Sequence, residues 1–319
     1  MTTNRRIVIG TRGSRLALWQ AEWVKAELQR LHPALTIDLN IIKTTGDKIL
    51  DVPLAQIGGK GLFVKEIEEA MLRYEADIAV HSMKDVPTEF PDGLHLAVIC
   101  RREDPHDAFI APMKDGKPTV ASFRDLPEGA CVGTSSLRRA CQLRSIRPDL
   151  KIAQLRGNLD SRFRKLDEGK FDAIILAVAG VKRLGMENRI TEVLPADVSL
   201  PAIGQGAVGI ESRIDDPEIN ALIAPLDHPA TSLCVRAERS LLKRLEGGCQ
   251  VPIAAHAEWT NGTLRLDGLV GSVSGDSIIR ESATGSDAAP EALGIALANI
   301  LLQRGAKRIL DEVYSKGMN

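Results

Sequence analysis

Two hydrophobic periodicities alternate along the first hundred residues, and this alternation restricts the chain to a small set of folds. In residues 14–31 and 63–74 the apolar side chains recur every three or four positions, as they do in helices. Short apolar or alternating runs, typical of strands, occupy residues 6–10, 35–41, 78–80 and 94–99. The strand–helix–strand order predicts an α/β domain whose helices cover a largely parallel sheet.

A polar stretch at residues 101–107 is predicted to be a linker, and the alternation resumes after it. The predicted strands are residues 130–133, 152–155 and 173–178, the predicted helices are residues 136–146 and 159–168, and a segment rich in Pro and Gly follows at 195–209. Gly133-Thr134-Ser135-Ser136 opens this unit much as Gly10-Thr11-Arg12-Gly13-Ser14 opens the first. We therefore expect two similar α/β lobes that face a cleft.

The last hundred residues have a different pattern. Helical spacing is predicted for residues 230–245, 289–302 and 306–314, and strands for residues 253–258, 264–270 and 277–280. Asn261-Gly262 between two of the strands is a typical hairpin turn. This part is predicted to be an α+β domain.

Composition narrows the classes of partner. Lys and Arg number 41 against 42 Asp and Glu, so the net charge is −1, and only 3% of residues are aromatic. Proteins that bind nucleic acids usually have a basic excess and often stack bases on aromatic rings, so we expect no nucleic-acid partner. No apolar run approaches the roughly 20 residues that span a bilayer, and residues 1–6 are polar, so neither a membrane anchor nor a secretory signal is expected.

Basic and hydroxyl side chains recur just after the predicted strands. Arg12 and Ser14 follow the first strand, and Ser135, Ser136, Arg138 and Arg139 follow the first strand of the second unit. Arg156, Arg162, Lys182 and Arg183 follow its later strands. In parallel α/β sheets ligands bind at these strand ends, where helix N-termini and arginines favour carboxylates and phosphates. The sequence therefore predicts an anion-lined cleft, and no nucleotide-binding glycine motif is present.

Two further segments lie next to this predicted cleft. Lys84 and Asp85 follow the strand at residues 78–80, and Asp85 could act as a general acid or base or stabilise a developing cation. A simple polar turn closed by Pro87 is the alternative interpretation. Gly58-Gly59-Lys60-Gly61 is either a mobile lid or a plain flexible loop.

The five cysteines are not equivalent. Cys100, Cys131, Cys141 and Cys234 lie in or at the ends of apolar strands and helices, which is typical of buried thiols in a reducing compartment. Cys249 is flanked by Gly247 and Gly248 in a predicted loop, so its thiol is a candidate nucleophile or attachment point. No metal-binding spacing of Cys and His is present.

Six motifs together resemble the porphobilinogen deaminase, or hydroxymethylbilane synthase, family. They are GTRGS at 10–14, VHSMKDVP at 80–87, VGTSSLRR at 132–139, RGN at 156–158, LPAIGQG at 200–206 and LEGGCQVP at 245–252. The resemblance covers essentially the whole chain. It implies two α/β domains like periplasmic binding proteins, joined by hinge strands, and a C-terminal α+β domain. The implied boundaries are 1–104 with 206–225 for domain 1, 105–205 for domain 2 and 226–319 for domain 3.

The same resemblance implies a transferase of tetrapyrrole and heme biosynthesis. Such an enzyme joins four porphobilinogen molecules head to tail, with loss of ammonia, onto a dipyrromethane cofactor and then releases hydroxymethylbilane by hydrolysis. The cofactor is implied to be attached to Cys249 through a thioether. A monomer in the cytoplasm, with porphobilinogen as its only partner, is also expected.

Residue roles follow from the matched motifs as implications. Asp85 is implied to stabilise pyrrole cations and assist proton transfer, with Lys84 beside it. The implied cofactor contacts are Lys84, Asp85, Ser135, Ser136, Arg138, Arg139 and Arg156. The implied substrate contacts are Arg12, Ser14, Arg156, Arg162 and Arg183. Lys60 and Phe63 are implied to belong to the lid loop, where Gln56 stands in place of a lysine common among relatives.

Two other functions compete with this one. A non-catalytic anion-binding protein with two lobes would have a secretory signal and would need neither Cys249 nor the third domain. A transferase or hydrolase with a cysteine nucleophile would need a histidine base near Cys249. His256 is the nearest in sequence, but it alternates within a predicted strand, which favours a structural role.

Overall fold

The computed structural model describes residues 6–48, 61–247 and 251–317, which fall into two compact units. The first contains the described residues up to Glu103 together with Ala207–Ser232, and the second contains Asp104–Gly206 and the described residues from Leu233 onward. None of the described helices combines the length and apolar content needed to cross a bilayer.

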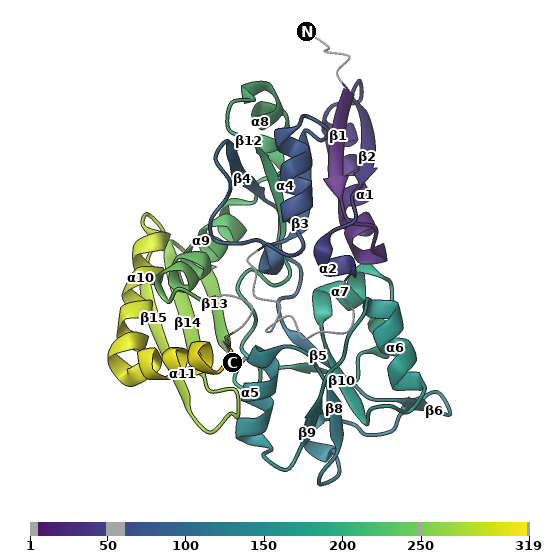
Figure 1. The fold of residues 1–319 in the computed structure, drawn as a ribbon, viewed down its shortest axis with the longest axis vertical. Helices are drawn as coiled ribbons and strands as arrows, with labels where there is room; N and C mark the ends of the chain where they lie inside the picture. The colour runs from purple at the N-terminus through teal and green to yellow at the C-terminus, as the bar shows by residue number, and fades with distance from the viewer. Residues whose placement is uncertain (1–5, 49–60, 248–250, 318–319) are drawn as a thin grey trace. The chain divides into compact units, whose positions relative to one another are not determined.

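The first unit is built on a mixed five-stranded sheet with the order β2-β1-β3-β12-β4 (Figure 1). Its strands are β1 (Arg6–Thr11), β2 (Thr36–Ile41), β3 (Ile78–Ser82), β4 (Leu94–Ile99) and β12 (Val208–Arg213). β1, β2 and β3 are parallel, whereas β12 runs antiparallel between β3 and β4. Sequence analysis did not predict β12, because its buried Glu211, Ser212 and Arg213 hide the apolar pattern.

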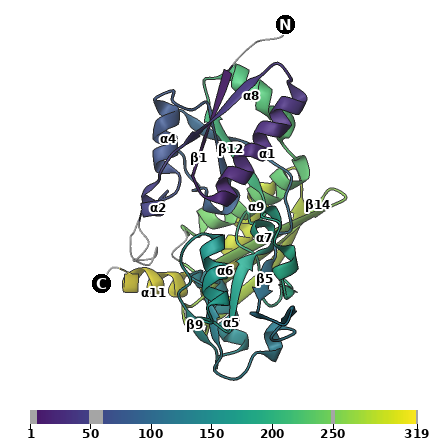
Figure 2. The ribbon, with the colours of Figure 1, turned by 90° about the vertical axis from the view of Figure 1, so that its right-hand side faces the viewer.

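Helices cover both faces of this sheet (Figure 2). On one face α1 (Arg15–Leu31) and α8 (Pro217–Ile223) pack against Ile7 and Ile9. On the other face α4 (Lys65–Leu72) packs through Ile67 against Ala79. Because successive strand residues point to opposite faces, the short apolar strands can serve both layers.

The second unit contains a sheet with the order β11-β5-β10-β8-β9. Its strands are β5 (Asp107–Ile110), β8 (Cys131–Gly133), β9 (Lys151–Ala153), β10 (Ala173–Ala177) and β11 (Glu192–Leu194). Its helices are α5 (Leu137–Ile146), α6 (Leu159–Asp167) and α7 (Val178–Arg183). β8, β9 and β10 are parallel, and β5 is antiparallel to β10. The linker predicted at 101–107 is wrong at its end, because Asp107 is the fully buried first residue of β5.

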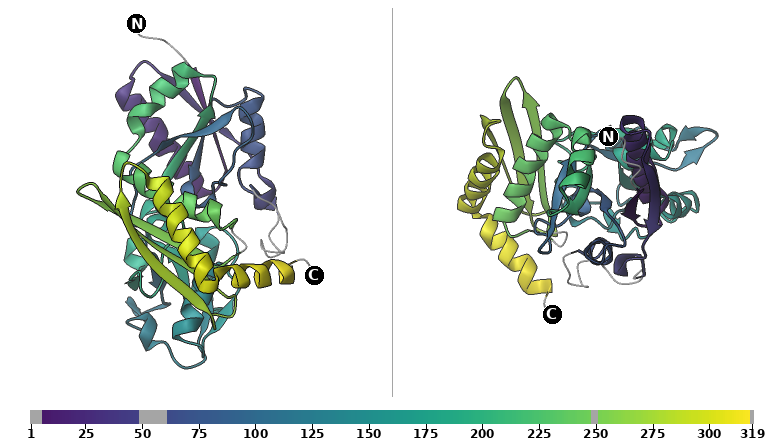
Figure 3. Two further views of the ribbon diagram at one scale, coloured as in Figure 1. Left: turned by 90° about the vertical axis from the view of Figure 1, so that its left-hand side faces the viewer. Right: turned by 90° about the horizontal axis from the view of Figure 1, so that it is seen from above.

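The C-terminal part forms the predicted α+β region, in which α10 lies along a three-stranded antiparallel sheet (Figure 3). It contains α9 (Pro229–Arg244), β13 (Ile253–Thr260), β14 (Thr263–Gly271), β15 (Ile278–Ser286), α10 (Pro290–Leu301) and α11 (Lys307–Gly317). The Asn261-Gly262 hairpin turn is confirmed: both residues have positive φ, 49° and 81°, as a type I′ turn requires. The prediction of α/β lobes followed by an α+β region is therefore confirmed.

Short elements complete the described chain. They are α2 (Thr45–Lys48), β6 (Met113–Lys114), β7 (Lys117–Pro118), the π-helical turn Leu302–Ala306, and 3-10 turns at Met83–Asp85, Phe123–Asp125, Glu187–Arg189 and Ala224–Leu226.

One glycine fixes the position of the turn at Met83–Asp85. A Cβ atom on Gly209 of β12 would lie 2.3 Å from Sδ of Met83 and 2.9 Å from a methyl carbon of Leu96. The backbone of the turn is held as well, because the Met83 N–H donates to the carbonyl of Ala207 at 3.0 Å. Glycine at this position therefore lets Met83 pack directly on the sheet.

We expect Gly209→Ala to lower the free energy of unfolding by about 1–3 kcal/mol, because the added methyl group overpacks a closed site. Denaturant unfolding measures the change. Adding Met83→Ala should recover part of the loss, because it removes the group that the new methyl strikes. Strictly additive effects of the two substitutions would contradict this packing.

Candidate functional site

The carboxyl ends of β1, β2 and β3 share one edge of the first sheet because these strands are parallel. Arg12 and Ser14 follow β1, Asp47 lies in α2 beyond β2, and Lys84 and Asp85 follow β3. The hydroxyl oxygen of Ser14 caps α1 by accepting from the Ala17 N–H at 3.3 Å. The predicted site residues of the first unit therefore gather at one sheet edge.

Arg12 is held in place by two neighbours. Its Nε donates to both carboxylate oxygens of Asp47 at 3.2 Å, and its guanidinium carbon lies 4.2 Å from the centre of the Phe63 ring. Burial raises the pKa of Asp47, but the hydrogen bonds and charge of Arg12, with help from Thr44, bring it below the usual value. Nη1 of Arg12 donates to no described residue, so that nitrogen can bind an anion.

Lys84 and Asp85 occupy the 3-10 turn after β3, and both are half-buried. Within the described ranges, no hydrogen bond or ion pair engages the carboxylate of Asp85. A half-buried carboxylate on a turn that is anchored at Met83 can accept hydrogen bonds from a ligand without first breaking internal ones.

Hydroxyl groups organise the matching edge of the second sheet, where β8 and β9 end. Ser135 joins the two strand ends: its hydroxyl donates to the carbonyl of Leu155 and accepts from the Leu155 N–H, both at 3.0 Å. Ser136 caps α5 by accepting from the Arg139 N–H at 3.4 Å. The start of α5 and its arginines are thereby fixed at the carboxyl edge of the sheet.

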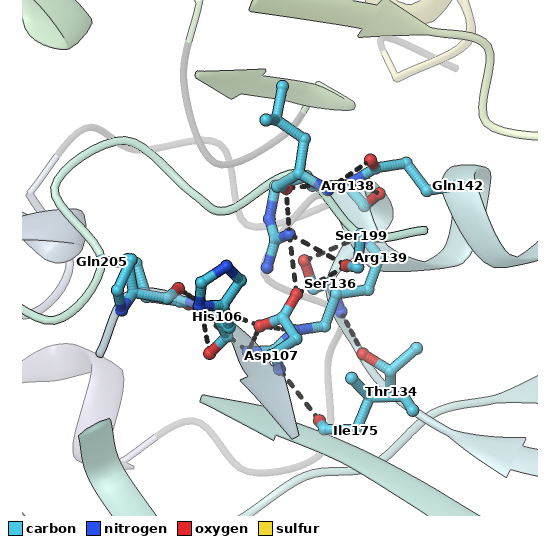
Figure 4. Close-up of polar contacts among 12 residues, drawn as sticks. His106, Asp107, Thr134, Ser136, Arg138, Arg139, Gln142, Ile175, Ser199 and Gln205 are labelled. Carbon is cyan, nitrogen blue, oxygen red and sulfur yellow. Dashed lines mark hydrogen bonds and ion pairs between the residues drawn. The ribbon is translucent and has the colours of Figure 1, made fainter. Parts of the chain in front are cut away.

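Asp107 is the centre of a buried polar cluster at the same edge (Figure 4). Its exposed fraction is 0%, and those of Arg138 and Arg139 are 5% and 6%. Arg138 Nη1 lies 2.8 Å from Oδ2, and Arg139 Nη2 lies 2.7 Å from Oδ1. Ser199 and Gln205 donate to the same carboxylate at 2.7 and 2.9 Å. Burial raises the pKa of Asp107, but the two guanidinium charges outweigh it and hold the pKa far below its usual range.

The two adjacent arginines differ in the donors that they retain. Arg139 donates through Nε and Nη2 to Asp107 and through Nη1 to the Ile175 carbonyl at 2.9 Å. Arg138 donates only through Nη1, to the Leu200 carbonyl at 2.6 Å and to the Ser199 and Asp107 side chains. Within the described chain, Nε and Nη2 of Arg138 have no acceptor. Arg138 is therefore the better anion-binding candidate of the pair.

Three further predicted arginines lie in the second unit. Arg162 donates from Nε to the Gly157 carbonyl at 2.9 Å, and Arg183 donates from Nη2 to the Gly206 carbonyl at 2.6 Å. Arg156 is half-buried, and that burial lowers the pKa of its guanidinium. Backbone carbonyls thus orient two of these side chains.

The four described cysteines are buried or half-buried, as the sequence predicts. Cys100, Cys141 and Cys234 are buried, and burial raises the pKa of the Cys141 thiol to about 12. Burial and the charge of Asp172 also raise the pKa of Cys131. Thiols of this kind are poor nucleophiles at neutral pH. Cys249, Lys60 and Gln56 lie outside the described residues.

Sequence reasoning missed Asp107, Ser199 and Gln205. Asp107 ends a run of charged and polar residues and so looks like part of a linker. The apolar residues 108–111 after it indicate a strand, but the sequence does not link Asp107 to Arg139, which lies 32 positions later.

We expect Asp107→Asn to lower the free energy of unfolding by about 3–5 kcal/mol, because it leaves two buried guanidinium groups without their counter-charge. Thermal or denaturant unfolding measures the loss. Asp38→Asn is the control, since it removes an exposed partner of Arg6 and should change stability little. Equal stability of the two variants would show that Asp107 is not the required counter-ion.

Comparisons with known proteins identify the family. A methionine-binding protein, MetQ, is similar in structure with a TM-score of 0.44 and 13% identity, over 70% of this chain and 90% of that chain. A profile described as porphobilinogen deaminase, dipyromethane cofactor binding domain matches residues 7–221, and one described as porphobilinogen deaminase, C-terminal domain matches residues 232–303. The porphobilinogen deaminase of Geobacter sulfurreducens is 58% identical over 98% of this chain and 96% of its own length. That of Pelobacter propionicus is 57% identical over 98% of both chains. The chain therefore belongs to the porphobilinogen deaminase family.

Proposed function

We propose that this chain joins four porphobilinogen molecules head to tail, with loss of ammonia, onto a dipyrromethane attached to Cys249, and then releases hydroxymethylbilane by hydrolysis. Membership of the family supports the reaction, and the match of residues 7–221 to a cofactor-binding domain supports the cofactor. The observation that carries the residue assignment is the Asp85 carboxylate, which no described residue engages.

The residues of the second unit fit the charge of a dipyrromethane. Each of its two pyrrole rings carries an acetate and a propionate, so its binding site must supply several donors for carboxylates. Arg138 has two nitrogens without an acceptor in the described chain, and Ser136 starts α5 beside it. We assign cofactor contacts to Lys84, Asp85, Ser135, Ser136, Arg138, Arg139 and Arg156, with Arg138 as the principal anion-binding group. Asp107 acts through both arginines as their positioning residue.

When bound, the dipyrromethane supplies the pyrrole carbon to which the first porphobilinogen is joined. The substrate carboxylates are assigned to Arg12, Ser14, Arg156, Arg162 and Arg183. Arg12 is already oriented by Asp47 and Phe63, so little side-chain entropy remains to be lost when an anion binds. Phe63, together with Lys60, is assigned to the lid that covers the substrate.

Asp85 is proposed as the catalytic carboxylate. Its oxygens accept hydrogen bonds from pyrrole N–H groups and stabilise the positive charge that develops on the ring when ammonia leaves. The same carboxylate can take up the proton that is lost when the new bond forms. Lys84, one residue earlier, contributes a cation for a neighbouring substrate carboxylate.

The domain boundaries, the oligomeric state and the location of the protein are also proposed. Three domains are assigned to residues 1–104 with 206–225, 105–205 and 226–319. A monomer in the cytoplasm fits this reaction, because porphobilinogen is small and charged and needs neither a membrane nor a nucleic acid to reach its site.

The cofactor assignment predicts a mass difference. Purified wild-type protein should exceed its sequence mass by one dipyrromethane, and peptide mapping should place the addition on Cys249. The Cys249→Ser variant should have the sequence mass, because its hydroxyl is a much weaker nucleophile. An unmodified thiol in active wild-type enzyme would refute the proposed attachment.

Asp85→Asn should reduce kcat by at least about a hundredfold, because the amide carries no charge to stabilise the developing cation. Hydroxymethylbilane formation by pre-assembled holoenzyme measures the rate, and thermal unfolding checks the fold. Asp92→Asn, an exposed site in the same unit, is the matched control and should keep its rate. Near-normal turnover of Asp85→Asn rules out the assigned role.

A further inference from the structure

Three titratable side chains are buried where α4 packs on β3 and β12. Ala79 of β3, which packs against Ile67 of α4, is paired in register with Glu211. Glu68 comes from α4, His81 from β3 and Glu211 from β12, and their exposed fractions are 7%, 5% and 1%. Nε2 of His81 lies 3.2 Å from Oε2 of Glu211. All three belong to the first unit, so the cluster joins one helix to the two central strands of the sheet.

This cluster holds more negative groups than positive ones. Oε1 of Glu68 and Oε1 of Glu211 are buried and find no hydrogen-bond partner in the described chain. Two buried carboxylates beside one imidazole cannot all be compensated when both acids are ionised. Adding one proton to a carboxyl group reduces the negative charge and supplies a donor, which is the least costly way to satisfy such a group.

The charged groups on neighbouring elements add no positive charge at Glu68 to that of His81, and Glu69 adds to the negative charge there. They are Lys65, Glu66 and Glu69 on α4, Lys84 and Asp85 after β3, and Arg213 on β12. Arg213 is paired with Asp77 and Asp216 and also donates to the carbonyls of Met71 and Ala76. Lys65 lies 3.9 Å from Glu69 on the exposed side of the helix.

The electrostatic environment of Glu68 agrees with a retained proton. Burial raises the pKa of its carboxyl to about 7, and the negative charge of Glu211 adds to the rise while His81 opposes it. The raised pKa favours the neutral carboxylic acid form of Glu68 in the folded protein.

The cluster is coupled to the Asp85 turn through the backbone. His81 is followed by Ser82 and then by the turn, and β3 pairs with β12 with His81 opposite Gly209. Met83, the first residue of the turn, packs at Gly209 and donates to the carbonyl of Ala207. A change in the fit of α4 on these two strands would therefore move the turn.

We propose that Glu68, His81 and Glu211 form a buried proton-sharing cluster in which a protonated Glu68 holds α4 against the sheet and thereby positions the Asp85 turn. Ionisation of Glu68 places two negative carboxylates together in a site of low dielectric constant, and their repulsion loosens α4. Glu68 is a positioning residue here and does not touch the substrate.

The direction in which the free energy of unfolding changes with pH follows from the number of protons that the folded and unfolded states bind. In the folded protein Glu68 keeps a proton that an ordinary glutamate loses near pH 4.5. The folded state therefore binds more protons than the unfolded state between about pH 4.5 and pH 7, and the free energy of unfolding falls as the pH rises through this range. Glu68→Gln imitates the protonated acid at every pH and should remove this loss.

Thermal unfolding between pH 5.5 and pH 8.5 tests the proposal on purified holoenzyme. The melting temperature of Glu68→Gln minus that of the wild type should grow by about 3–6 °C over this range. Glu22→Gln removes the same charge from an exposed position on α1 in the same unit, and its difference should stay constant with pH. A constant difference for Glu68→Gln as well would overturn the proposal.

A second measurement does not depend on how well the variant folds. Infrared spectra of the wild type should contain a protonated carboxylic acid band at pH 6 that disappears by pH 8.5. This band should be missing at pH 6 from Glu68→Gln or, if that variant does not fold, from Glu68→Leu. Absence of such a band from the wild type at pH 6 would also overturn the proposal.

Turnover gives a separate readout that rests on the proposed role of Asp85. The wild-type kcat should decline on the alkaline side as Glu68 ionises, and Glu68→Gln should retain its rate to higher pH. One outcome is that the unfolding and infrared results hold while the kcat–pH profiles of the wild type and Glu68→Gln coincide. In that case Glu68 does retain a proton, but its control of the Asp85 turn is refuted. Failure of the deaminase assignment itself would leave the unfolding and infrared results unaffected.

Discussion

The charge of Asp107 is buried away from water, and the site of the second unit depends on how the chain compensates it. A buried carboxylate is tolerated only when it is paired and hydrogen-bonded on all sides. Its partners come from the start of α5 and from residues 199 and 205, which are distant in the sequence. These ion pairs and hydrogen bonds therefore bring together β5, α5 and the segment before β12, and the position of Arg138 is a consequence of that assembly.

In the proposed function several arginines bind one polyanionic ligand, and their anchoring to the backbone would orient them for it. A guanidinium group has five N–H donors in a planar fork, so one nitrogen can bond to a carbonyl while another edge faces a ligand. Arg138, Arg162 and Arg183 donate to the carbonyls of Leu200, Gly157 and Gly206. Their orientation is set before the ligand arrives, which reduces the entropy lost on binding.

Local periodicity was enough to predict most elements, whereas long-range compensation was not visible in the sequence. The helix α1 and the Asn261-Gly262 turn depend on nearby residues, and both were predicted. Strand β12 was missed because its buried Glu211 and Arg213 have partners more than a hundred residues away, His81 and the Met71 carbonyl. Arg138 and Arg139 were predicted as an equivalent pair, because their different hydrogen bonds depend on Asp107, Ile175 and Leu200.

The two units stabilise a buried carboxyl group in opposite forms, one ionised and one protonated. Burial alone raises the pKa of both Asp107 and Glu68. Two adjacent guanidinium groups reverse this effect for Asp107, so that acid stays ionised and fixes cations that can face an anionic ligand. Glu68 faces another carboxylate and one histidine, so a proton is the available counter-charge. The permanent charge of Arg makes the Asp107 cluster insensitive to pH near neutrality. The Glu68 cluster can lose its proton, so the sheet edge that carries Asp85 is the pH-sensitive one.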